Sequence, residues 1–207
     1  MFKDRSDAGR QLAEKLALYR GKEAVVLALP RGGVVTGFEI ARVLSLPLDI
    51  VAVRKVGAPD NPEYAIGAVG ANGTVILNDA EAATIDKTWL AGEIAAQKKE
   101  AQRRSRVYRA GKKSLDITGK TAIIVDDGIA TGLTMRIAVR SAKAEKAGKI
   151  VVAVPVAPPE AVHALSEEGA DEVIVLEPPE EFLGAVGAHY IRFEQVEDDE
   201  VIRLMGV

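Results

Sequence analysis

The sequence contains no cysteine among its 207 residues. Disulfide bridges and thiolate metal sites are therefore excluded, and a reducing or a hot compartment is the natural expectation. Histidine is nearly as rare, since His163 and His189 are the only two. Neither stands near a group of other metal-ligating residues, so we do not expect a histidine-based metal centre.

Long apolar runs are also missing. No stretch approaches the ~20 apolar residues that cross a membrane, and the charged start MFKDRSDAGRQ lacks the apolar part of a signal peptide. We therefore expect a cytoplasmic protein that does not bind membranes. A positive charge balance is absent too: the net charge of -3 argues against a nucleic-acid partner, although bases gather in residues 87–113 and acids in residues 167–200.

What is present is the composition of a globular protein, with 48% hydrophobic and 28% charged residues. The length fits a single domain over residues 1–207. Short β-branched runs alternate with helical patterns, which predicts an α/β fold: a mainly parallel, Rossmann-like sheet with helices on both faces. The expected strands cover residues 24–29, 48–53, 74–77, 121–125, 150–156 and 172–176, and the expected helices residues 34–44, 86–108, 133–147 and 159–168.

Two segments fall outside this alternation. Residues 55–73 are rich in Gly, Pro and Asn, which predicts a long mobile loop followed by a short hairpin-like element. Residues 177–207 begin with a Pro-Pro break and mix glycine, aromatic and acidic residues. They predict a small C-terminal cap over the active site.

The string IIVDDGIATGLT, residues 123–134, joins an expected strand to an expected helix. Adjacent carboxylates at a strand end need cations or hydrogen-bond donors nearby, and a ribose diol supplies donors for both. The small residues that follow let successive backbone N–H groups face one anion, and the helix adds its positive end. The predicted site for a ribose 5-phosphate comprises Asp126, Asp127, Gly128, Ile129, Ala130, Thr131, Gly132 and Thr134.

Two shorter signals follow the first two expected strands. LPRGG, residues 29–33, combines a forked cation with two glycines that let the backbone approach an anion closely. Arg54 and Lys55 stand at the end of the strand expected at residues 48–53. LPRGG could equally be an ordinary strand-to-helix turn, and the alternative for Arg54 and Lys55 is a solvated pair of charges.

Together these segments resemble the type I phosphoribosyltransferase family. Residues 123–134 are similar to its phosphoribosyl pyrophosphate loop and LPRGG to its pyrophosphate loop, and the likeness extends over about residues 24–176. The resemblance implies transfer of the 5-phosphoribosyl group from 5-phosphoribosyl-1-pyrophosphate to a nitrogen acceptor, such as a nucleobase, with release of pyrophosphate. It also implies a pyrophosphate site at Arg31, Gly32, Gly33, Arg54 and Lys55.

The same resemblance implies Mg²⁺ as a cofactor, which Asp126 and Asp127 meet only indirectly, through ribose or water. The segment 55–73 is the expected lid that excludes water, and it carries Glu63 and Tyr64. The predicted catalytic residues are Arg31, Lys55, Glu63, Asp126 and Asp127.

One position in the loop departs from part of the family. Hypoxanthine-type members carry an acid directly before the Thr-Gly pair, where this chain has Ala130. A methyl group cannot act as a general base, so the loop is nearer to that of adenine-type members. Glu63 is the carboxylate that the lid offers instead.

Three functions compete: a transferase, a non-catalytic sensor that binds the same ligand, and a ribose-phosphate pyrophosphokinase. The kinase resembles a tandem of two such domains, whereas this chain has room for one. Regulatory members usually add a DNA-binding segment or a basic RNA-binding face, and neither is expected here. The transferase therefore leads, while the acceptor and the oligomeric state, including a homo-oligomer, stay open.

Overall fold

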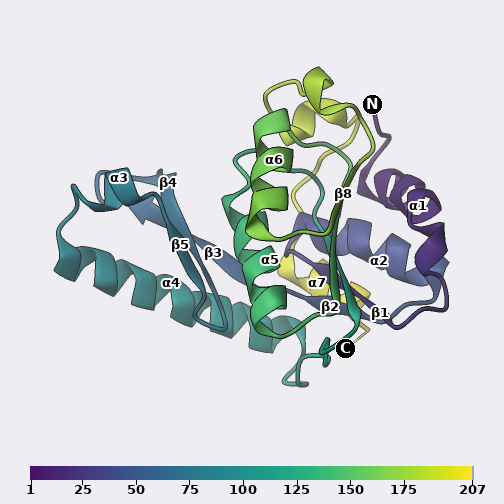
Figure 1. Cartoon of the computed structure of the whole chain (residues 1–207), viewed down its shortest axis with the longest axis horizontal. Helices are drawn as coiled ribbons and strands as arrows, with labels where there is room; N and C mark the ends of the chain where they lie inside the picture. The colour runs from purple at the N-terminus through teal and green to yellow at the C-terminus, as the bar shows by residue number, and fades with distance from the viewer. Residues whose placement is uncertain (207) are drawn as a thin grey trace.

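A computed structural model describes residues 1–206, apart from the side chain of Glu63, and consists of a body and a projecting arm (Figure 1). The body is built on a five-stranded parallel sheet with the strand order β2-β1-β6-β7-β8. This confirms the predicted α/β class with a parallel sheet. The strands are β1 (Ala24–Ala28), β2 (Leu48–Ile50), β6 (Thr121–Val125), β7 (Lys149–Val154) and β8 (Glu172–Val175).

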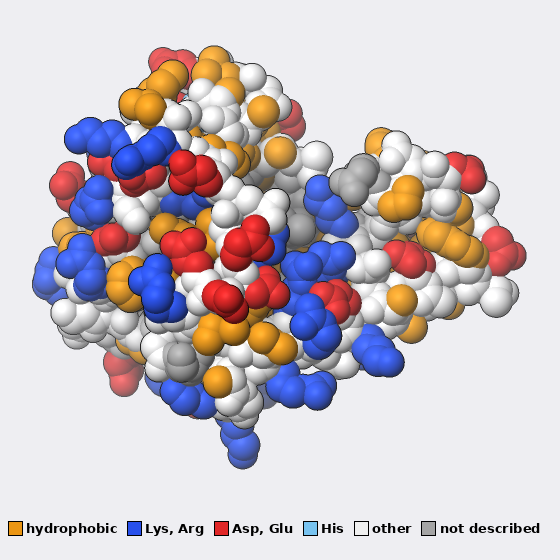
Figure 2. Space-filling view, turned by 180° about the vertical axis from the view of Figure 1, so that it is seen from behind, with side chains coloured by type: hydrophobic (Ala, Val, Ile, Leu, Met, Phe, Trp, Pro, Cys, Tyr) orange, Lys and Arg blue, Asp and Glu red, His pale blue; other side chains and the backbone are white. Residues whose placement is uncertain are grey.

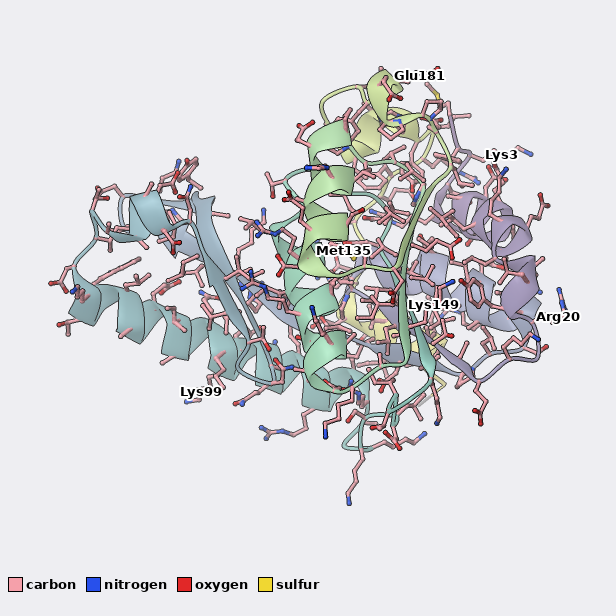
Figure 3. The ribbon with its side chains drawn as sticks, viewed as in Figure 1. Lys3, Arg20, Lys99, Met135, Lys149 and Glu181 are labelled. Atoms are coloured by element: carbon pink, nitrogen blue, oxygen red, sulfur yellow. The ribbon has the colours of Figure 1, made fainter. Side chains whose placement is uncertain are left out.

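Helices cover both faces of this sheet, as predicted. On one face α5 (Leu133–Ala144) and α6 (Pro159–Glu168) bury their apolar sides, and Met135 of α5 packs against the sheet (Figure 3). On the other face lie α1 (Arg5–Lys15) and α2 (Gly32–Leu44). Each fully buried aliphatic side chain in these layers contributes about 1.5–3 kcal/mol to the stability of the folded chain.

Helix α1 was not predicted. Ala8 and Leu12 of the helix and Leu16 at its C-cap recur every fourth position and are fully buried, but polar residues surround them. Asp4 caps the helix, because its carboxylate accepts a hydrogen bond from the Asp7 N–H at 2.9 Å. A capped helix with one narrow apolar stripe is easily overlooked in a charged segment. Its burial places residue 5 beside the sheet.

The arm contains an antiparallel sheet, β3 (Val53–Ala58), β4 (Asn61–Gly70) and β5 (Val75–Leu77), backed by α3 (Asp79–Ala82) and α4 (Lys87–Tyr108) (Figure 1). The prediction of a long loop at residues 55–73 is therefore wrong: most of it forms the hairpin β3–β4. Its glycines let strands pack closely rather than bend freely. A Cβ on Gly67, for example, would lie 2.5 Å from the Ile76 carbonyl oxygen.

Two predicted strands need correction for related reasons. The apolar run at residues 48–53 is divided, because β2 ends at Ile50 and β3 of the arm begins at Val53. The run at residues 74–77 belongs to the arm as β5, and it pairs antiparallel with β4 instead of joining the parallel sheet. Hydrophobic periodicity identifies a strand but does not say which sheet it joins.

The C-terminal segment, residues 177–206 in the described part, contains η2 (Pro179–Glu181), η3 (Val186–His189) and α7 (Asp198–Leu204). It meets the start of the chain, where the Phe2 N–H donates to the His189 carbonyl at 2.8 Å. Helix α7 packs against α2 and α4, and the short helix η1 (Ala17–Tyr19) follows α1. None of the helices in residues 1–206 has the length and apolar character that a membrane span requires.

Candidate functional site

The two predicted anion-binding loops meet where the strand order of the body sheet reverses. Strands β1 and β6 are parallel neighbours, but the chain proceeds from β1 to β2 on one side and from β6 to β7 on the other. In open α/β sheets such a reversal opens a crevice beyond the carboxyl ends of the strands, and ligands bind there. The loops that follow β1 and β6 border this crevice.

Contact between the loops depends on two glycines. A Cβ on Gly32 would lie 1.9 Å from Asp127 Oδ2, and one on Gly33 would lie 2.8 Å from Asp126 Oδ1. Any larger residue would therefore push the acidic loop away. The Leu29 N–H donates to the Val125 carbonyl at 2.9 Å, and the Pro30–Arg31 peptide bond is cis. The sequence-predicted elements LPRGG and Asp-Asp thus form one site.

The two carboxylates of the acidic loop differ in their surroundings. Asp126 Oδ1 accepts a hydrogen bond from the Asp127 N–H at 2.8 Å. Burial, followed by the charge of the neighbouring Asp127, raises the pKa of Asp126 well above its usual range. A ligand that brings hydroxyl donors or positive charge would therefore stabilise the ionised form of this carboxyl.

Asp127 is held by a residue that the sequence analysis missed. Arg5 Nε lies 2.6 Å from Asp127 Oδ2, and both side chains are nearly enclosed, with 11% and 15% of their surfaces exposed. The same guanidinium donates to the Glu194 carbonyl at 2.7 Å and lies 3.8 Å above the centre of the Phe193 ring. No local sequence signal marks Arg5, because its partner stands 122 positions away.

Tyr190 is a second residue that the sequence did not reveal. Its hydroxyl donates to the Asp127 carbonyl oxygen at 2.5 Å, and burial raises its pKa above the usual range. Tyr190 stacks at a tilt with Phe2 and Phe193, whose ring centres lie 5.4 and 4.9 Å away. The C-terminal segment therefore fixes the backbone of the acidic loop from one side.

Beyond the acids, the loop turns into α5 through a left-handed glycine. Gly132, with φ of +79°, is the N-cap residue of α5, and no side chain caps this helix end. Its first backbone N–H groups are therefore available to an anion, and the helix dipole favours negative charge there. Thr134 lies in the first turn, and Ala130 and Thr131 border the same turn. No hydrogen bond within the described residues engages the two threonine hydroxyls.

The middle of the loop is held against the chain that follows β7 and against the C-terminal segment. The Ile129 N–H donates to the Val156 carbonyl at 2.9 Å. Gly128 has a φ of +154°, and a Cβ there would lie 2.5 Å from Val186 Cγ1. A glycine is required at this position both for the backbone conformation and for the close approach of Val186.

Arg31 lies at the site but is paired with the C-terminal segment. Its guanidinium is 3.4 Å from Glu197 Oε2 and 3.5 Å from Asp198 Oδ1. Asp198 also accepts a hydrogen bond of 2.7 Å from the Tyr108 hydroxyl, and burial together with this bond raises the pKa of Tyr108 to about 12. In this conformation the Arg31 guanidinium, which the family resemblance assigns to pyrophosphate, is paired with two carboxylates instead.

The structure separates the two candidates Arg54 and Lys55. Arg54 donates to Gln97 of α4 at 3.1 Å and is partly buried, which lowers its pKa. Lys55 is exposed and shares a strand face with Val53, which packs against α5 near Leu133. Lys55 therefore projects from the side of the hairpin that faces α5.

The arm and the body enclose a hollow. Figure 2 shows a notch between them, with Lys and Arg side chains gathered along it. Lys99, by contrast, extends from the outer side of α4 (Figure 3). The backbone at position 63 belongs to β4, near the tip of the hairpin, but the side chain of Glu63 lies outside the described residues.

Asp126 and Asp127 are the carboxylates at this site that could meet Mg²⁺. Among the described side chains, no group of three or more His, Cys, Asp or Glu residues is arranged to hold a metal ion. Asp127 is neutralised by Arg5, and Asp126 stands beside it as the second oxygen donor. This pair does not form a protein-only magnesium site, but it fits an indirect contact with a cation that arrives on a substrate.

The fold is that of an α/β protein in which two loops meet at one crevice, and comparison with known proteins gives the family. The protein family described as "Phosphoribosyl transferase domain" matches residues 3–179 of this chain. The chain belongs to this family.

A protein of Mycobacterium tuberculosis strain H37Rv named "Putative phosphoribosyl transferase Rv0571c" is 45% identical over 207 residues, which covers 99% of this chain and 46% of that protein. The chain thus spans about half the length of this relative. The crystal structure of TT1426 from Thermus thermophilus matches with a TM-score of 0.82 and 44% identity, covering 99% and 97% of the two chains. The Aquifex aeolicus protein AQ2163 shares the fold at 14% identity, with a TM-score of 0.51 and coverage of 83% and 73%.

Proposed function

We propose that the chain transfers the 5-phosphoribosyl group from 5-phosphoribosyl-1-pyrophosphate to a nitrogen acceptor and releases pyrophosphate. The observation that carries the proposal is the contact between the two glycines of LPRGG and the two acids of the β6 loop. It brings a predicted pyrophosphate loop and a predicted ribose-phosphate loop to one crevice. The membership of the phosphoribosyl transferase domain family supports this reading.

The ribose 5-phosphate half of the donor would occupy the loop after β6. Asp126 and Asp127 accept hydrogen bonds from the ribose 2- and 3-hydroxyls. The 5-phosphate faces the uncapped N-terminus of α5, where Thr131 and Thr134 add hydroxyl donors. Arg5 holds the Asp127 carboxylate in place from behind, so it acts as a positioning residue.

The diphosphate would lie along LPRGG, opposite the arm. Its departure leaves positive charge on the ribose ring and adds negative charge to the leaving group, so stabilisation of this transition state is mainly electrostatic. Arg31 contributes a forked cation after it exchanges Glu197 and Asp198 for phosphate oxygens. Lys55 contributes a second cation from the hairpin, and closure of the arm would exclude water.

Magnesium would enter as the counter-ion of the donor. Bound to the diphosphate, it would neutralise charge on the leaving group. The protein would contact it only through ribose or water, with Asp126 and Asp127 as the nearest acids, because the described residues offer no third ligand. A dependence of turnover on Mg²⁺ is thus expected without tight metal binding to the protein alone.

The experiment measures pyrophosphate release from 5-phosphoribosyl-1-pyrophosphate with purines, pyrimidines, orotate, nicotinate and small amines in turn. The double variant Asp126→Asn/Asp127→Asn should lose well over tenfold in turnover or in calorimetric affinity, which corresponds to more than ~1.4 kcal/mol. Asp116→Asn, an exposed carboxylate outside the site, is the matched control. Unchanged affinity in the double variant would refute the site, and binding without turnover would identify a sensor instead.

A further inference from the structure

The far end of the arm holds a cavity that the proposed reaction does not use. It has a volume of about 590 Å³, within the range of small-molecule sites. It lies on the α4 side of the hairpin, opposite the face that carries Lys55. Its walls come from the hairpin tip, α3 and the first turn of α4: Ala58, Pro59, Asp60, Tyr64, Ile66, Glu81, Thr84, Ile85, Asp86 and Trp89.

Two aromatic rings of this cavity are unusually exposed. Tyr64 has 53% and Trp89 37% of its surface accessible, and Trp89 is the single tryptophan of the chain. Aromatic rings offer a large apolar surface to a ligand, and these two rings are open to solvent within one cavity. The face of a tryptophan ring is the best side-chain partner for an organic cation.

The charges of the cavity have one sign. Asp60, Glu81 and Asp86 line it, and none of its lining residues is a lysine or arginine. Glu81 Oε1 accepts a hydrogen bond of 2.5 Å from the Tyr64 hydroxyl. Glu81 Oε2 is shielded from solvent and has no hydrogen-bond partner among the described residues.

A buried carboxylate oxygen without a hydrogen-bond donor is energetically unfavourable. An anionic ligand would add to this cost, and a neutral apolar ligand would leave the oxygen unpaired. A ligand with N–H donors, a positive charge and a flat surface would donate a hydrogen bond to Glu81, neutralise the acids and stack on the Trp89 ring. A guanidinium group has all three properties, and an alkylammonium group has the first two.

We propose that this arm-tip cavity, between Tyr64, Glu81 and Trp89, is a binding site for an organic cation of the alkylguanidinium or alkylammonium class. The cation is either a free small molecule or the side chain of a lysine or arginine from a second copy of this chain. The proposal does not depend on the transferase reaction.

Titration with n-butylguanidinium tests the site, because the emission of Trp89 reports its occupancy directly. Neutral n-butylurea is the matched control, since it has the same shape but lacks the charge. We expect a saturable change in emission with butylguanidinium and at least tenfold weaker binding of butylurea. Equal responses to both probes, or no saturable response to butylguanidinium, would overturn the proposal.

Variants locate the binding to the cavity. Glu81→Gln should weaken butylguanidinium at least tenfold, whereas Asp79→Asn, an exposed carboxylate change on the same helix, should leave it unchanged. Trp89→Leu, followed by calorimetry, serves as an independent variant and should weaken the probe similarly. Equal affinity in Glu81→Gln and Asp79→Asn would place the cation elsewhere and refute the proposal.

Rising protein concentration distinguishes the two sources of the cation. If a second copy supplies it, Trp89 emission shifts as the chains associate in sedimentation, and butylguanidinium reverses both changes. If the cation is a free ligand, emission is independent of protein concentration while the butylguanidinium response persists.

Discussion

The Arg5 guanidinium and the Asp127 carboxylate lie 2.6 Å apart, although 122 positions separate them in the sequence. The pair joins the first helix of the chain to the loop that carries the proposed ribose site. Breaking a nearly enclosed ion pair leaves one charge unpaired, and this usually costs several kcal/mol. The position of the acidic loop therefore depends on a helix that lies outside every recognised motif.

Arg5→Met should lower the free energy of unfolding by about 3 kcal/mol, measured by urea denaturation. Arg10→Met on the same helix is the control, because Arg10 is 48% exposed and lies 3.7 Å from Glu39; it should cost less than about 1 kcal/mol. Adding Asp127→Asn to Arg5→Met should recover part of the loss. Equal effects of the two arginine variants would show that the Arg5–Asp127 pair is not a structural link.

Gly32→Ala should displace the acidic loop, because the new methyl group would meet Asp127 Oδ2 and also lie 2.8 Å from Arg5 Nε. We expect a loss of about 1–3 kcal/mol in stability and of at least tenfold in affinity for 5-phosphoribosyl-1-pyrophosphate. Gly92→Ala, which meets no atom within 4 Å on an open helix face, is the control. It should be neutral or raise stability by up to about 1 kcal/mol.

The parallel sheet and its loops were predictable from sequence because their signals are local. Buried parallel strands appear as short β-branched runs, and the expected strand at residues 121–125 and helix at residues 159–168 match β6 and α6 residue for residue. The acidic loop and LPRGG were found for the same reason, since each motif is continuous in sequence.

What escaped prediction depends on contacts between distant segments. The Gly-rich arm was interpreted as a loop, because nothing local shows that Gly67 faces the β5 backbone. Arg5 and Tyr190 reach the acidic loop from opposite ends of the chain. The acids that pair with Arg31 belong to a C-terminal segment whose path no periodicity indicates.

Asp126 should make stability fall as the pH rises. Its pKa is raised in the folded state, so the folded protein holds this proton more tightly than the unfolded chain. The contribution is fully present below the ordinary value near 3.8 and is lost as the pH rises through the folded pKa. Relative to wild type, Asp126→Asn should therefore gain stability steadily above pH ~4 in urea denaturation.

Asp116→Asn is a control, because its effect on stability should depend on pH in the opposite direction. The Thr118 backbone N–H lowers the pKa of Asp116, so its contribution is present above the ordinary value and is lost as the pH falls through the folded pKa. Its difference from wild type should shrink toward low pH. If Asp126→Asn instead lost stability relative to wild type as the pH rose, the folded pKa of Asp126 would not be raised.

Arg31 should distinguish the two halves of the donor. Arg31→Ala should weaken 5-phosphoribosyl-1-pyrophosphate more than ribose 5-phosphate in calorimetry, because only the former carries the diphosphate. Glu197→Gln combined with Asp198→Asn removes the competing acids and should tighten the donor roughly threefold, since exposed pairs are weak. Glu200→Gln on the same helix turn is the control. Equal losses for both ligands in Arg31→Ala would remove Arg31 from the diphosphate site.

Ala130 leads to a prediction about the acceptor. It stands directly before the Thr131-Gly132 pair, where an acid would be needed to exchange a proton with a hypoxanthine or guanine ring. Because a methyl group cannot do this, hypoxanthine and guanine should be poor acceptors in the pyrophosphate-release assay. The hairpin tip, where β4 carries Glu63, is the segment that could bring a carboxylate to the reaction when the arm closes.

Glu63→Gln should accordingly lower turnover several-fold while leaving the affinity for 5-phosphoribosyl-1-pyrophosphate nearly unchanged, because a proton-transfer residue contributes to the transition state and not to donor binding. Asp60→Asn at the hairpin turn is the matched control and should keep wild-type turnover. Efficient turnover of hypoxanthine by the wild-type protein would show that the inference from Ala130 is wrong. Equal turnover in Glu63→Gln and wild type would instead assign the proton transfer to the acceptor itself.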